Sequence, residues 1–529
     1  MRHLLISRRL AVASLVIAGG LAGAQSARAD VAPVFGRETV LPGSGGAEPS
    51  LAIDYSPASA GKNIYVSSIS PGANLWHSLD GGQSWSQPVA FDTSGPQRGN
   101  DADVTVGPDG TVYVVDLNIA YSLVQSSTDH GHSFSSGSQT TPEADRPWIT
   151  AGPNGAVHVI YHDFATETVL DCMSPNGGTA FLPCVDTFGA NNPTATEECT
   201  SNTDIGKALR IDPTDGSLNI VFSCSTANQA AQSPPYGPVH DYYMSKSTDG
   251  GVTWNTYTMY VADLSNGKSP TLSNFWTSFA IDSAGNYYAL MDGTYDDNNV
   301  ATNPYHVYLL TSKDHGQTWS QTPVQGDYEA DGKGTHVLSD LAVTSPGNVD
   351  VVFYGTTVTG EPNGVCGSVA SQGPCPNGEG LPDYTSANRP GWRVSLAQSV
   401  NALDANPTFM QTPVTSEFTH FGEICTNGIV CGQSDRTLLD YISVGVDCTG
   451  DAHVAFAGNP QENTTTQQPN VYEVDQTAGS TISPPAACPA PATSTPELPL
   501  TALAPIAGLG AAVALAMRRR SGLRIHSTA

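Results

Sequence analysis

The sequence predicts an all-β protein in which six or seven four-stranded antiparallel blades form a ring, a β-propeller, with seven blades favoured. Two repeated patterns support this architecture. A hairpin pattern recurs seven times, a polar turn motif follows several of the copies, and no helical period of useful length interrupts them. One hairpin and its turn motif span about 50 to 60 residues, which is the size of one blade.

The hairpin copies join two runs of alternating apolar residues through a turn rich in Gly, Asn, Asp or Pro. In the third copy, residues 148–151 and 157–161 flank the turn Gly152-Pro153-Asn154-Gly155. Alternation with period two on both sides of such a turn is typical of a β-hairpin. The copies cover residues 48–67, 101–116, 146–163, 204–224, 274–292, 340–354 and 440–457.

The turn motif is S-x-D-x-G-x-[ST]-[WF], the Asp box. Intact copies begin at Ser78, Ser127, Ser247 and Ser312, and a degenerate copy begins at Ser174. The Asp carboxylate and the Ser hydroxyl suit hydrogen bonds to turn backbone, and the Gly permits a positive φ. We therefore expect the Asp boxes to be structural, with no catalytic role for their Asp residues.

A propeller ring must close, because an open ring leaves exposed sheet edges. Either residues 31–41 or residues 469–474 can supply the closing strand, and the sequence does not choose between them. Between the sixth and seventh hairpins we expect a long loop, where Cys366 and Cys375 stand among many Gly and Pro residues.

The N-terminal end predicts export. Residues 1–29 begin with three arginines (Arg2, Arg8 and Arg9), which are followed by an apolar run and the small-residue site Ala27-Arg28-Ala29. This is the layout of a cleaved secretory signal peptide. Residues 30–480 are then expected to form the propeller outside the cell.

The C-terminal end predicts a surface tether. Residues 481–499 are rich in proline and are expected to form a stiff stalk. Residues 498–529 hold the sequence LPLTA, an apolar stretch and three consecutive arginines. This tail resembles a sortase cell-wall sorting signal, although Ala502 stands where that motif more often has Gly. The expected partner of the tail is a sortase or, through the apolar stretch and the arginines, the membrane.

The charge of the chain excludes some partners. Of 21 basic residues, eight arginines lie in the two ends, so residues 30–517 carry 13 basic and 49 acidic residues, a formal charge of −36. So acidic a chain argues against nucleic acid and against anionic membrane as partners.

The cysteines favour disulfides over metal ligation, because an exported chain with an even number of them, ten, is expected to oxidise them. Connectivity does not follow from sequence. Local spacing suggests the pairs Cys172–Cys184, Cys199–Cys224, Cys366–Cys375, Cys425–Cys431 and Cys448–Cys488.

Asp boxes in a propeller resemble the sialidase superfamily, and the resemblance covers roughly residues 47–459. It implies six blades and hydrolysis of terminal sialic acids by three arginines that clamp the substrate carboxylate, an acid/base Asp and a Tyr nucleophile activated by a Glu. A guanidinium fits a carboxylate with two hydrogen bonds. The chain departs from the family's first-arginine motif, since only Arg37, in a different context, precedes the first Asp box in residues 30–80.

The starts of the inner strands are expected to surround one mouth of the central channel. On the sialidase pattern, residues near these starts divide into substrate-binding arginines, proton donors and a nucleophile pair. The substrate-binding candidates are Arg98, Arg146 and Arg436, the proton-donor candidates are Asp103 and Asp145, and the nucleophile pair is Tyr441 with Glu423. The alternative is that recurring Asp and Arg residues tie neighbouring blades together by ion pairs and turn caps.

No cofactor or catalytic metal is expected. His158, His162 and Asp163 lack a further ligand at recognisable spacing. Asp292, Asp296 and Asp297 offer oxygen ligands suited to a structural Ca²⁺. They lack the spacing of an EF-hand loop, so an ordinary polar loop is favoured.

Together these observations predict an exported, surface-tethered, sialidase-like propeller that engages terminal sialic acid or related glycans, with hydrolysis left open. The alternative is a non-catalytic extracellular propeller for ligand binding, adhesion or scaffolding, whose partner is a glycan or a protein.

Overall fold

The computed structural model describes residues 31–489 apart from internal gaps. Its longer gaps are residues 92–100, 225–240, 262–270, 273–277, 295–304, 325–333, 363–386, 427–434 and 460–468, and the remainder are one to three residues long. No helix among the described residues is long and apolar enough to cross a membrane. The expected signal peptide and the apolar C-terminal stretch both lie outside the described residues.

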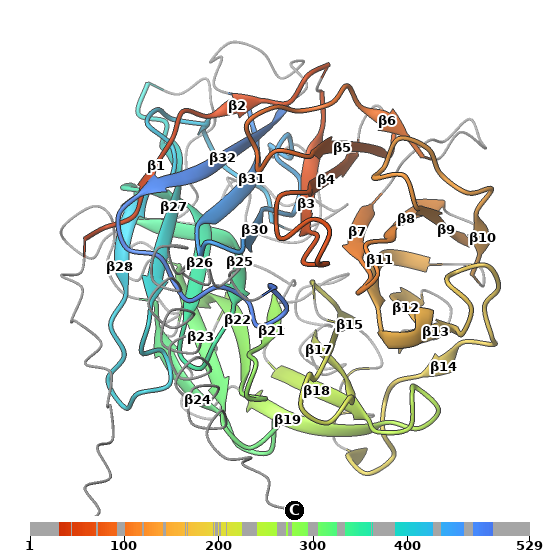
Figure 1. Cartoon of the computed structure of the whole chain (residues 1–529). Coiled ribbons are helices and arrows are strands. Elements are labelled where there is room, and N and C mark those ends of the chain that lie inside the picture. Colours follow the sequence, from red (N-terminus) through yellow and green to blue (C-terminus); the bar gives the residue numbers. More distant parts are fainter. Residues whose placement is uncertain are drawn as a thin grey trace, which may run out of the picture.

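The chain forms seven antiparallel sheets arranged around a central axis (Figure 1). The prediction of an all-β propeller with seven blades is confirmed. In sheet order each blade has four strand positions, and in blades 4 to 7 one position is divided between two short strands.

The first four blades follow one another along the chain. Blade 1 contains β3 (Ala47–Ile53), β4 (Ile64–Ile69), β5 (Asn74–Ser78) and β6 (Val89–Ala90). Blade 2 contains β7 (Ala102–Val106), β8 (Val112–Asn118), β9 (Tyr121–Ser127) and β10 (Ser138–Gln139). Blade 3 contains β11 (Ala144–Ala151), the short 3₁₀ turn η1 (Pro153–Gly155), β12 (Val157–Asp163), β13 (Thr168–Ser174) and β14 (Val185–Asp186). Blade 4 contains β15 (Thr203–Asp204), β16 (Leu209–Ile211), β17 (Leu218–Cys224), β18 (Asp241–Ser247) and β19 (Asn255–Val261).

The last three blades complete the ring. Blade 5 contains β20 (Thr271–Leu272), β21 (Phe279–Ile281), β22 (Tyr287–Thr294), β23 (His306–Ser312) and β24 (Ser320–Pro323). Blade 6 contains β25 (Thr335–Val343), β26 (Val349–Thr356), β27 (Gly391–Ser399), β28 (Met410–Pro413) and β29 (His420–Phe421). Blade 7 contains β30 (Ser443–Val446), β31 (Ala452–Gly458), β32 (Asn470–Ala478), β1 (Val34–Phe35) and β2 (Thr39–Val40).

Blade 7 closes the ring with both ends of the propeller domain. Its third strand is β32, and its outermost position is filled by β1 and β2, which pair antiparallel with β32. Both segments considered for closure therefore lie in the same blade, and residues 31–41 supply the outer strand. In Figure 1 the red N-terminal strands lie beside the blue β32.

Hydrogen bonds between inner strands hold neighbouring blades in register. Asp103, Asp340 and Ser443 each accept a bond from a backbone N–H of the next blade. The donors are Ile149, Val444 and Leu51 respectively, each at 3.0 Å. A buried N–H group without a hydrogen-bond partner destabilises the fold. Asp103, Asp340 and Ser443 therefore have a structural role between blades.

The Asp boxes make the same turn in four blades. In the first, Gly82 N donates to Ser78 Oγ at 2.9 Å and Ser84 N donates to Asp80 Oδ1 at 2.9 Å. The other boxes repeat both bonds. Hydrogen bonds to the carboxylate lower the pKa of Asp249 and of Asp314 to about 2. These carboxylates are therefore ionised turn acceptors, as a structural role requires.

Three of the suggested disulfides are present, namely Cys172–Cys184, Cys199–Cys224 and Cys448–Cys488. Cys425 is also disulfide-bonded. Cys366, Cys375 and Cys431 lie outside the described residues, so their suggested pairs stay predictions. Several disulfides in one chain fit an extracellular protein.

The segment after β32, residues 479–489, packs against the propeller, and we call it the C-terminal strap. Ile482 is buried, Ser483 N donates to Asn348 Oδ1 at 3.1 Å, and Cys488 is joined to Cys448. In Figure 1 the strap runs from β32 toward the middle of the ring. Residues 481–489 had been expected in the stalk, and the disulfide and Ile482 explain why they lie against the propeller.

Candidate functional site

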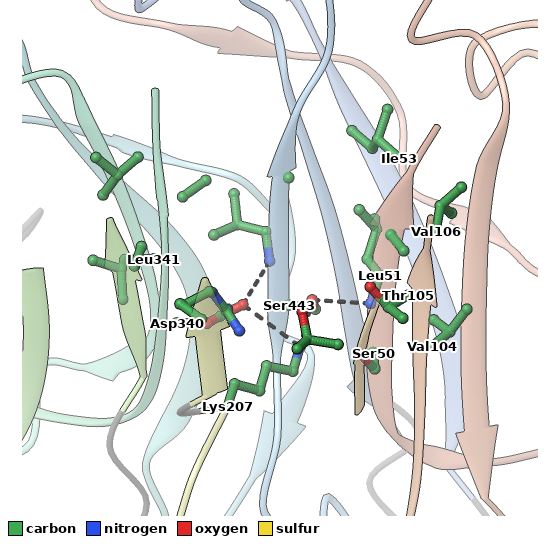
Figure 2. Close-up of a pocket in the computed structure, with 18 of the residues that line it drawn as sticks. Ser50, Leu51, Ile53, Val104, Thr105, Val106, Lys207, Asp340, Leu341 and Ser443 are labelled. Atoms are coloured by element: carbon green, nitrogen blue, oxygen red, sulfur yellow. Dashed lines mark hydrogen bonds and ion pairs between the residues drawn. The ribbon is translucent and has the colours of Figure 1, made fainter. Parts of the chain in front are cut away.

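The inner strands of all seven blades surround a central cavity of about 340 Å³. Its lining combines apolar side chains, such as Leu51, Val104 and Leu341, with a comparable share of polar groups (Figure 2). Ligand sites in proteins are typically mostly apolar pockets with a few convergent polar groups. The polar groups of this cavity are therefore the first candidates for recognition.

Four charged side chains line the cavity: Asp103, Lys207, Arg210 and Asp340. Lys207 Nζ donates to Ser443 Oγ at 2.5 Å and lies 3.6 Å from Asp340 Oδ2. Figure 2 shows Lys207 reaching toward Ser443 and Asp340. Since burial disfavours charge, it lowers the pKa of Lys207 and of Arg210 and raises that of Asp103.

A second group of polar side chains lies where inner strands begin, and we call it the mouth cluster. Its members come from β3, from β11, from the residue before β7 and from the segment before β30. They are Glu48, Asp101, Asp145, Arg146, Arg436, Asp440 and Tyr441.

Asp440 is the centre of the mouth cluster. Arg436 binds it through both terminal guanidinium nitrogens, at 2.6 and 2.5 Å, and Arg146 Nη2 lies 3.6 Å from Asp440 Oδ2. The backbone N–H of Asp440 donates to Glu48 Oε1 at 3.0 Å. Arg146 Nε is also 3.8 Å from Asp145 Oδ2. The cluster thus joins blades 1, 3 and 7.

The backbone of the mouth cluster is strained. Glu48, Arg146 and Leu439 have φ values of 52°, 53° and 58°, in the left-handed region that residues other than Gly rarely adopt. Such outliers concentrate at functional sites, although they are not by themselves proof of one. Here they coincide with irregular register near the starts of β3 and β11.

Burial raises the pKa of two carboxyl groups in the mouth cluster. Burial, followed by the charges of Asp101 and Asp440, raises the pKa of Glu48 well above its ordinary value. Burial and then the charge of Asp145 raise the pKa of Asp101 to about 6. Burial also raises the pKa of Tyr441. A carboxyl group that titrates near neutral pH suits proton transfer as well as hydrogen-bond donation to a ligand.

The structure brings part of the expected sialidase-like set together. Arg146, Arg436, Asp145 and Tyr441 lie in the mouth cluster. The two arginines meet on Asp440, and their guanidinium groups are therefore already engaged by a carboxylate of the chain. Arg98 lies outside the described residues.

Asp103 and Glu423 make contacts of their own, and Tyr441 contacts the channel wall. Asp103 lines the channel, where Ser50 Oγ donates to it at 2.6 Å in addition to the Ile149 N–H. Glu423 is buried and accepts a bond from Asp435 N at 3.2 Å. The ring of Tyr441 packs edge-on against Trp148, with centroids 4.8 Å apart. Trp148 also lines the cavity, so Trp148 links Tyr441 of the mouth cluster to the channel.

Lys207 and Arg210 were not among the sequence-based candidates. The fourth hairpin copy, residues 204–224, contains both, and their place near its inner strand is the signal that identifies them. A hairpin pattern is recognised by its alternating apolar residues. Charged residues inside the hairpin, unlike those at its start, are therefore not identified as site candidates by that pattern.

The weaker metal candidates are occupied by protein contacts. His158 Nδ1 lies 3.1 Å from both carboxylate oxygens of Asp171, and Asp163 accepts a bond from Thr166 N at 3.0 Å. Asp292 accepts a bond from Ser339 N at 3.1 Å. Asp296 and Asp297 lie outside the described residues.

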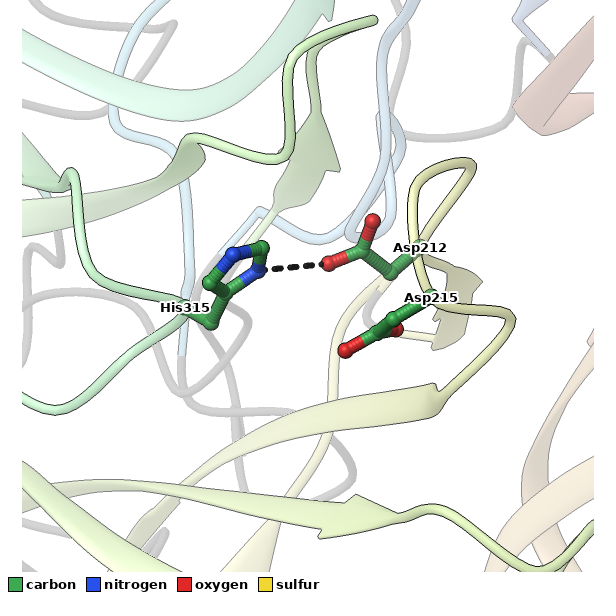
Figure 3. A group of neighbouring side chains, drawn as sticks. All are labelled: Asp212, Asp215 and His315. Atoms are coloured by element: carbon green, nitrogen blue, oxygen red, sulfur yellow. Dashed lines mark hydrogen bonds and ion pairs between the residues drawn. The ribbon is translucent and has the colours of Figure 1, made fainter.

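A different group, Asp212, Asp215 and His315, has the proximity of metal ligands (Figure 3). Asp212 Oδ2 lies 3.0 Å from His315 Nδ1 and accepts a bond from the Tyr287 hydroxyl at 2.8 Å. Asp215 pairs with Lys246 at 2.9 Å. These bonds supply the carboxylates with donors and join blade 4 to blade 5, so we interpret the group as an inter-blade brace.

The architecture and the central cavity define a seven-bladed β-propeller with a ligand-sized channel. No protein-family model matches the chain, and no curated protein matches its sequence. Solved structures do match it in fold.

A protein of unknown function from Dyadobacter fermentans has 11% identity and a TM-score of 0.42, with 85% of this chain and 99% of that chain covered. A polysaccharide lyase described as an ulvan lyase has 12% identity and a TM-score of 0.47, covering 83% and 95%. An intramolecular trans-sialidase from Ruminococcus gnavus has 9% identity and a TM-score of 0.36, covering 83% and 94%. The likeness concerns the fold and assigns no activity.

Proposed function

We propose that this protein is an exported, surface-tethered propeller that binds an extracellular glycan at the channel mouth. The observation that carries the proposal is the mouth cluster, in which four carboxyl groups face two guanidinium groups. Asp101, Asp145 and Arg436 are partly exposed, so they are available to a ligand. A carboxylate accepts bonds from sugar hydroxyls, whereas a protonated carboxyl or a guanidinium donates them.

The charge of the mouth cluster favours a neutral glycan over a sialic acid. Asp440 already holds Arg146 and Arg436, so the carboxylate of a sialic acid would have to compete with Asp440 for both. The sugar would also approach the carboxylate of Asp145 beside Arg146. A neutral sugar does not have to displace Asp440 from the two arginines, and the carboxylate of Asp145 does not repel it.

Glycan binding is tested on an array of neutral and sialylated glycans with the purified protein and Asp101→Asn. This variant keeps the shape of the side chain and removes its charge. Loss of a hydrogen bond to a charged group costs about 1.5–3 kcal/mol, or roughly 10- to 100-fold in affinity. Asp404→Asn, an exposed control in blade 6, should bind as the unaltered protein does. Equal binding by all three proteins, or binding to no glycan, would contradict the proposal.

A second candidate function is hydrolysis of terminal sialic acid, favoured by the placement of Tyr441 beside Arg146 and of an Asp101 carboxyl that titrates near neutral pH. A fluorogenic sialoside assay tests it. Hydrolysis that is lost in Tyr441→Phe at unchanged melting temperature would support a tyrosine nucleophile. Turnover that survives this change would show that Tyr441 is not the nucleophile. If the unaltered protein shows no turnover, glycan binding remains as the proposed function.

A further inference from the structure

The mouth cluster and the C-terminal strap lie at opposite ends of the inner strands. The C-terminal strap lies at the end where the inner strands finish, because Cys488 is bonded to Cys448 in the turn after β30. Pro485 of the strap is itself a lining residue of the cavity. Pro485, Lys207 and Arg210 therefore line one and the same cavity.

The carboxylates in this pocket already have hydrogen-bond partners. Asp103 accepts from Ser50 Oγ through Oδ1 and from Ile149 N through Oδ2. Asp340 accepts from Ser278 Oγ through Oδ1 and from Val444 N through Oδ2, and Lys207 lies beside it. The carboxylates of Asp103 and Asp340 thus connect neighbouring blades.

The donors in this pocket are in surplus. A guanidinium has five N–H donors, and the bond recorded for Arg210 within the described part of the chain is the one from Nη1 to Leu209 O at 2.8 Å. Ser443 Oγ accepts from Lys207 Nζ at 2.5 Å and from Leu51 N at 3.0 Å, which leaves its own proton to donate. Lys207 has three ammonium protons for Ser443 and for the more distant Asp340.

We propose that the channel binds a small oxyanion, such as a carboxylate, between Arg210, Lys207 and the Ser443 hydroxyl. An oxyanion supplies acceptors where the wall supplies donors, and charge-assisted bonds of this type are the stronger ones. The cavity of about 340 Å³ is at the small end of the usual range for ligand pockets. The inference uses no residue of the mouth cluster and does not depend on glycan binding there.

Burial makes the two cations receptive to such a ligand. The pKa of Lys207 and the pKa of Arg210 are both lowered because desolvation outweighs the attraction of Asp340 and Asp103. An anion brought next to them would offset part of that penalty.

The test is calorimetric titration of the purified protein with sodium acetate, sodium sulfate and sodium glucuronate at constant ionic strength, balanced with sodium chloride. The variant is Arg210→Gln, and the matched control is Arg393→Gln, which removes a guanidinium that lies over Phe418 in blade 6. We expect saturable binding to the unaltered protein and to the control, and at least tenfold weaker binding to Arg210→Gln. Acetate and sulfate binding would indicate a general oxyanion pocket, whereas binding of glucuronate alone would indicate the carboxylate of an acidic sugar.

A thermal readout covers the case in which Arg210→Gln does not fold. The melting temperature of the unaltered protein should rise with oxyanion concentration at constant ionic strength, because a ligand that binds only the folded state stabilises it. Ser443→Ala should reduce that rise. Absence of saturable binding and of a melting shift, or equal affinity in Arg210→Gln and Arg393→Gln, would overturn the inference while leaving the glycan-array result unaffected.

Discussion

Some buried carboxylates in this protein accept hydrogen bonds from the next blade, and others do not. Asp103 and Asp340 each accept a backbone hydrogen bond from the next blade and so connect two blades. Asp350 is different, because the bond it receives within the described residues is from Gln398 Nε2, at 3.0 Å to Oδ1. Burial raises the pKa of Asp350 to about 7, so its carboxyl group is a source of pH-dependent stability.

We predict that Asp350→Asn stabilises the protein at pH 8 and has little effect at pH 4. The folded-state pKa of about 7 lies above the ordinary value of 3.8. The contribution of Asp350 to stability is therefore fullest below pH 4 and is lost as the pH rises toward 7, since Asp350 ionises at lower pH in the unfolded chain than in the folded one. The amide of Asn mimics the protonated acid at every pH. Urea unfolding at both pH values measures the difference.

The exposed Asp404→Asn is the control for that comparison and should show no such pH dependence. A stability difference between Asp350→Asn and the unaltered protein that is the same at pH 4 and pH 8 would contradict the shifted pKa.

At the scale of elements, the Asp boxes connect blades as well as closing turns. In the box of blade 4, Gly250 and Gly251 both have positive φ, 75° and 88°. A Cβ on Gly250 would meet nothing within 4 Å, whereas a Cβ on Gly251 would lie 2.5 Å from Asp171 Oδ2 in blade 3. The two neighbouring glycines therefore separate the conformational role of glycine from its packing role.

We predict that Gly250→Ala costs about 1–2 kcal/mol, the usual penalty of a left-handed residue with a side chain. Gly251→Ala should cost roughly 1–3 kcal/mol more, because overpacking at the blade interface is added to the same backbone strain. Denaturant unfolding of the two variants measures the gap. Equal losses would show that the box glycine does not hold blade 4 against blade 3.

The hairpins and boxes were predictable because each is a local pattern, with alternation and turn chemistry contained in a short window. The mouth cluster was predictable in part. Arg146, Arg436 and Tyr441 stand near inner-strand starts, but the meeting of both arginines on Asp440 depends on how blade 3 approaches blade 7. Lys207 contacts Ser443 across 236 residues of sequence, and no local pattern carries such a contact.

At the scale of the whole molecule, stability depends on ring closure. Thr39 pairs with Glu473 and Val40 with Tyr472, so the outer edge of blade 7 is covered by the N-terminal segment. An uncovered strand edge offers its N–H and C=O groups to other chains. The residues before β3 thus protect the whole ring.

We predict that a secreted form lacking residues 31–41 is less stable and self-associates, because the edge of β32 becomes exposed. A form that ends at residue 489 keeps all the described contacts and should remain monomeric with an unchanged melting temperature. Light scattering and thermal unfolding measure both outcomes. A monomeric, fully stable N-terminal deletion would show that closure does not rest on β1 and β2.

Closure of the ring by the N-terminal segment also determines the order in which contacts form during folding. Val34 pairs with Ala478, so the earliest residues of the propeller have no partner until nearly the whole domain has been synthesised. Contacts between such distant parts of a chain form slowly. The Cys448–Cys488 bond belongs to the same late stage. Until then the ring is incomplete, and the C-terminal strap is not yet joined to the turn after β30.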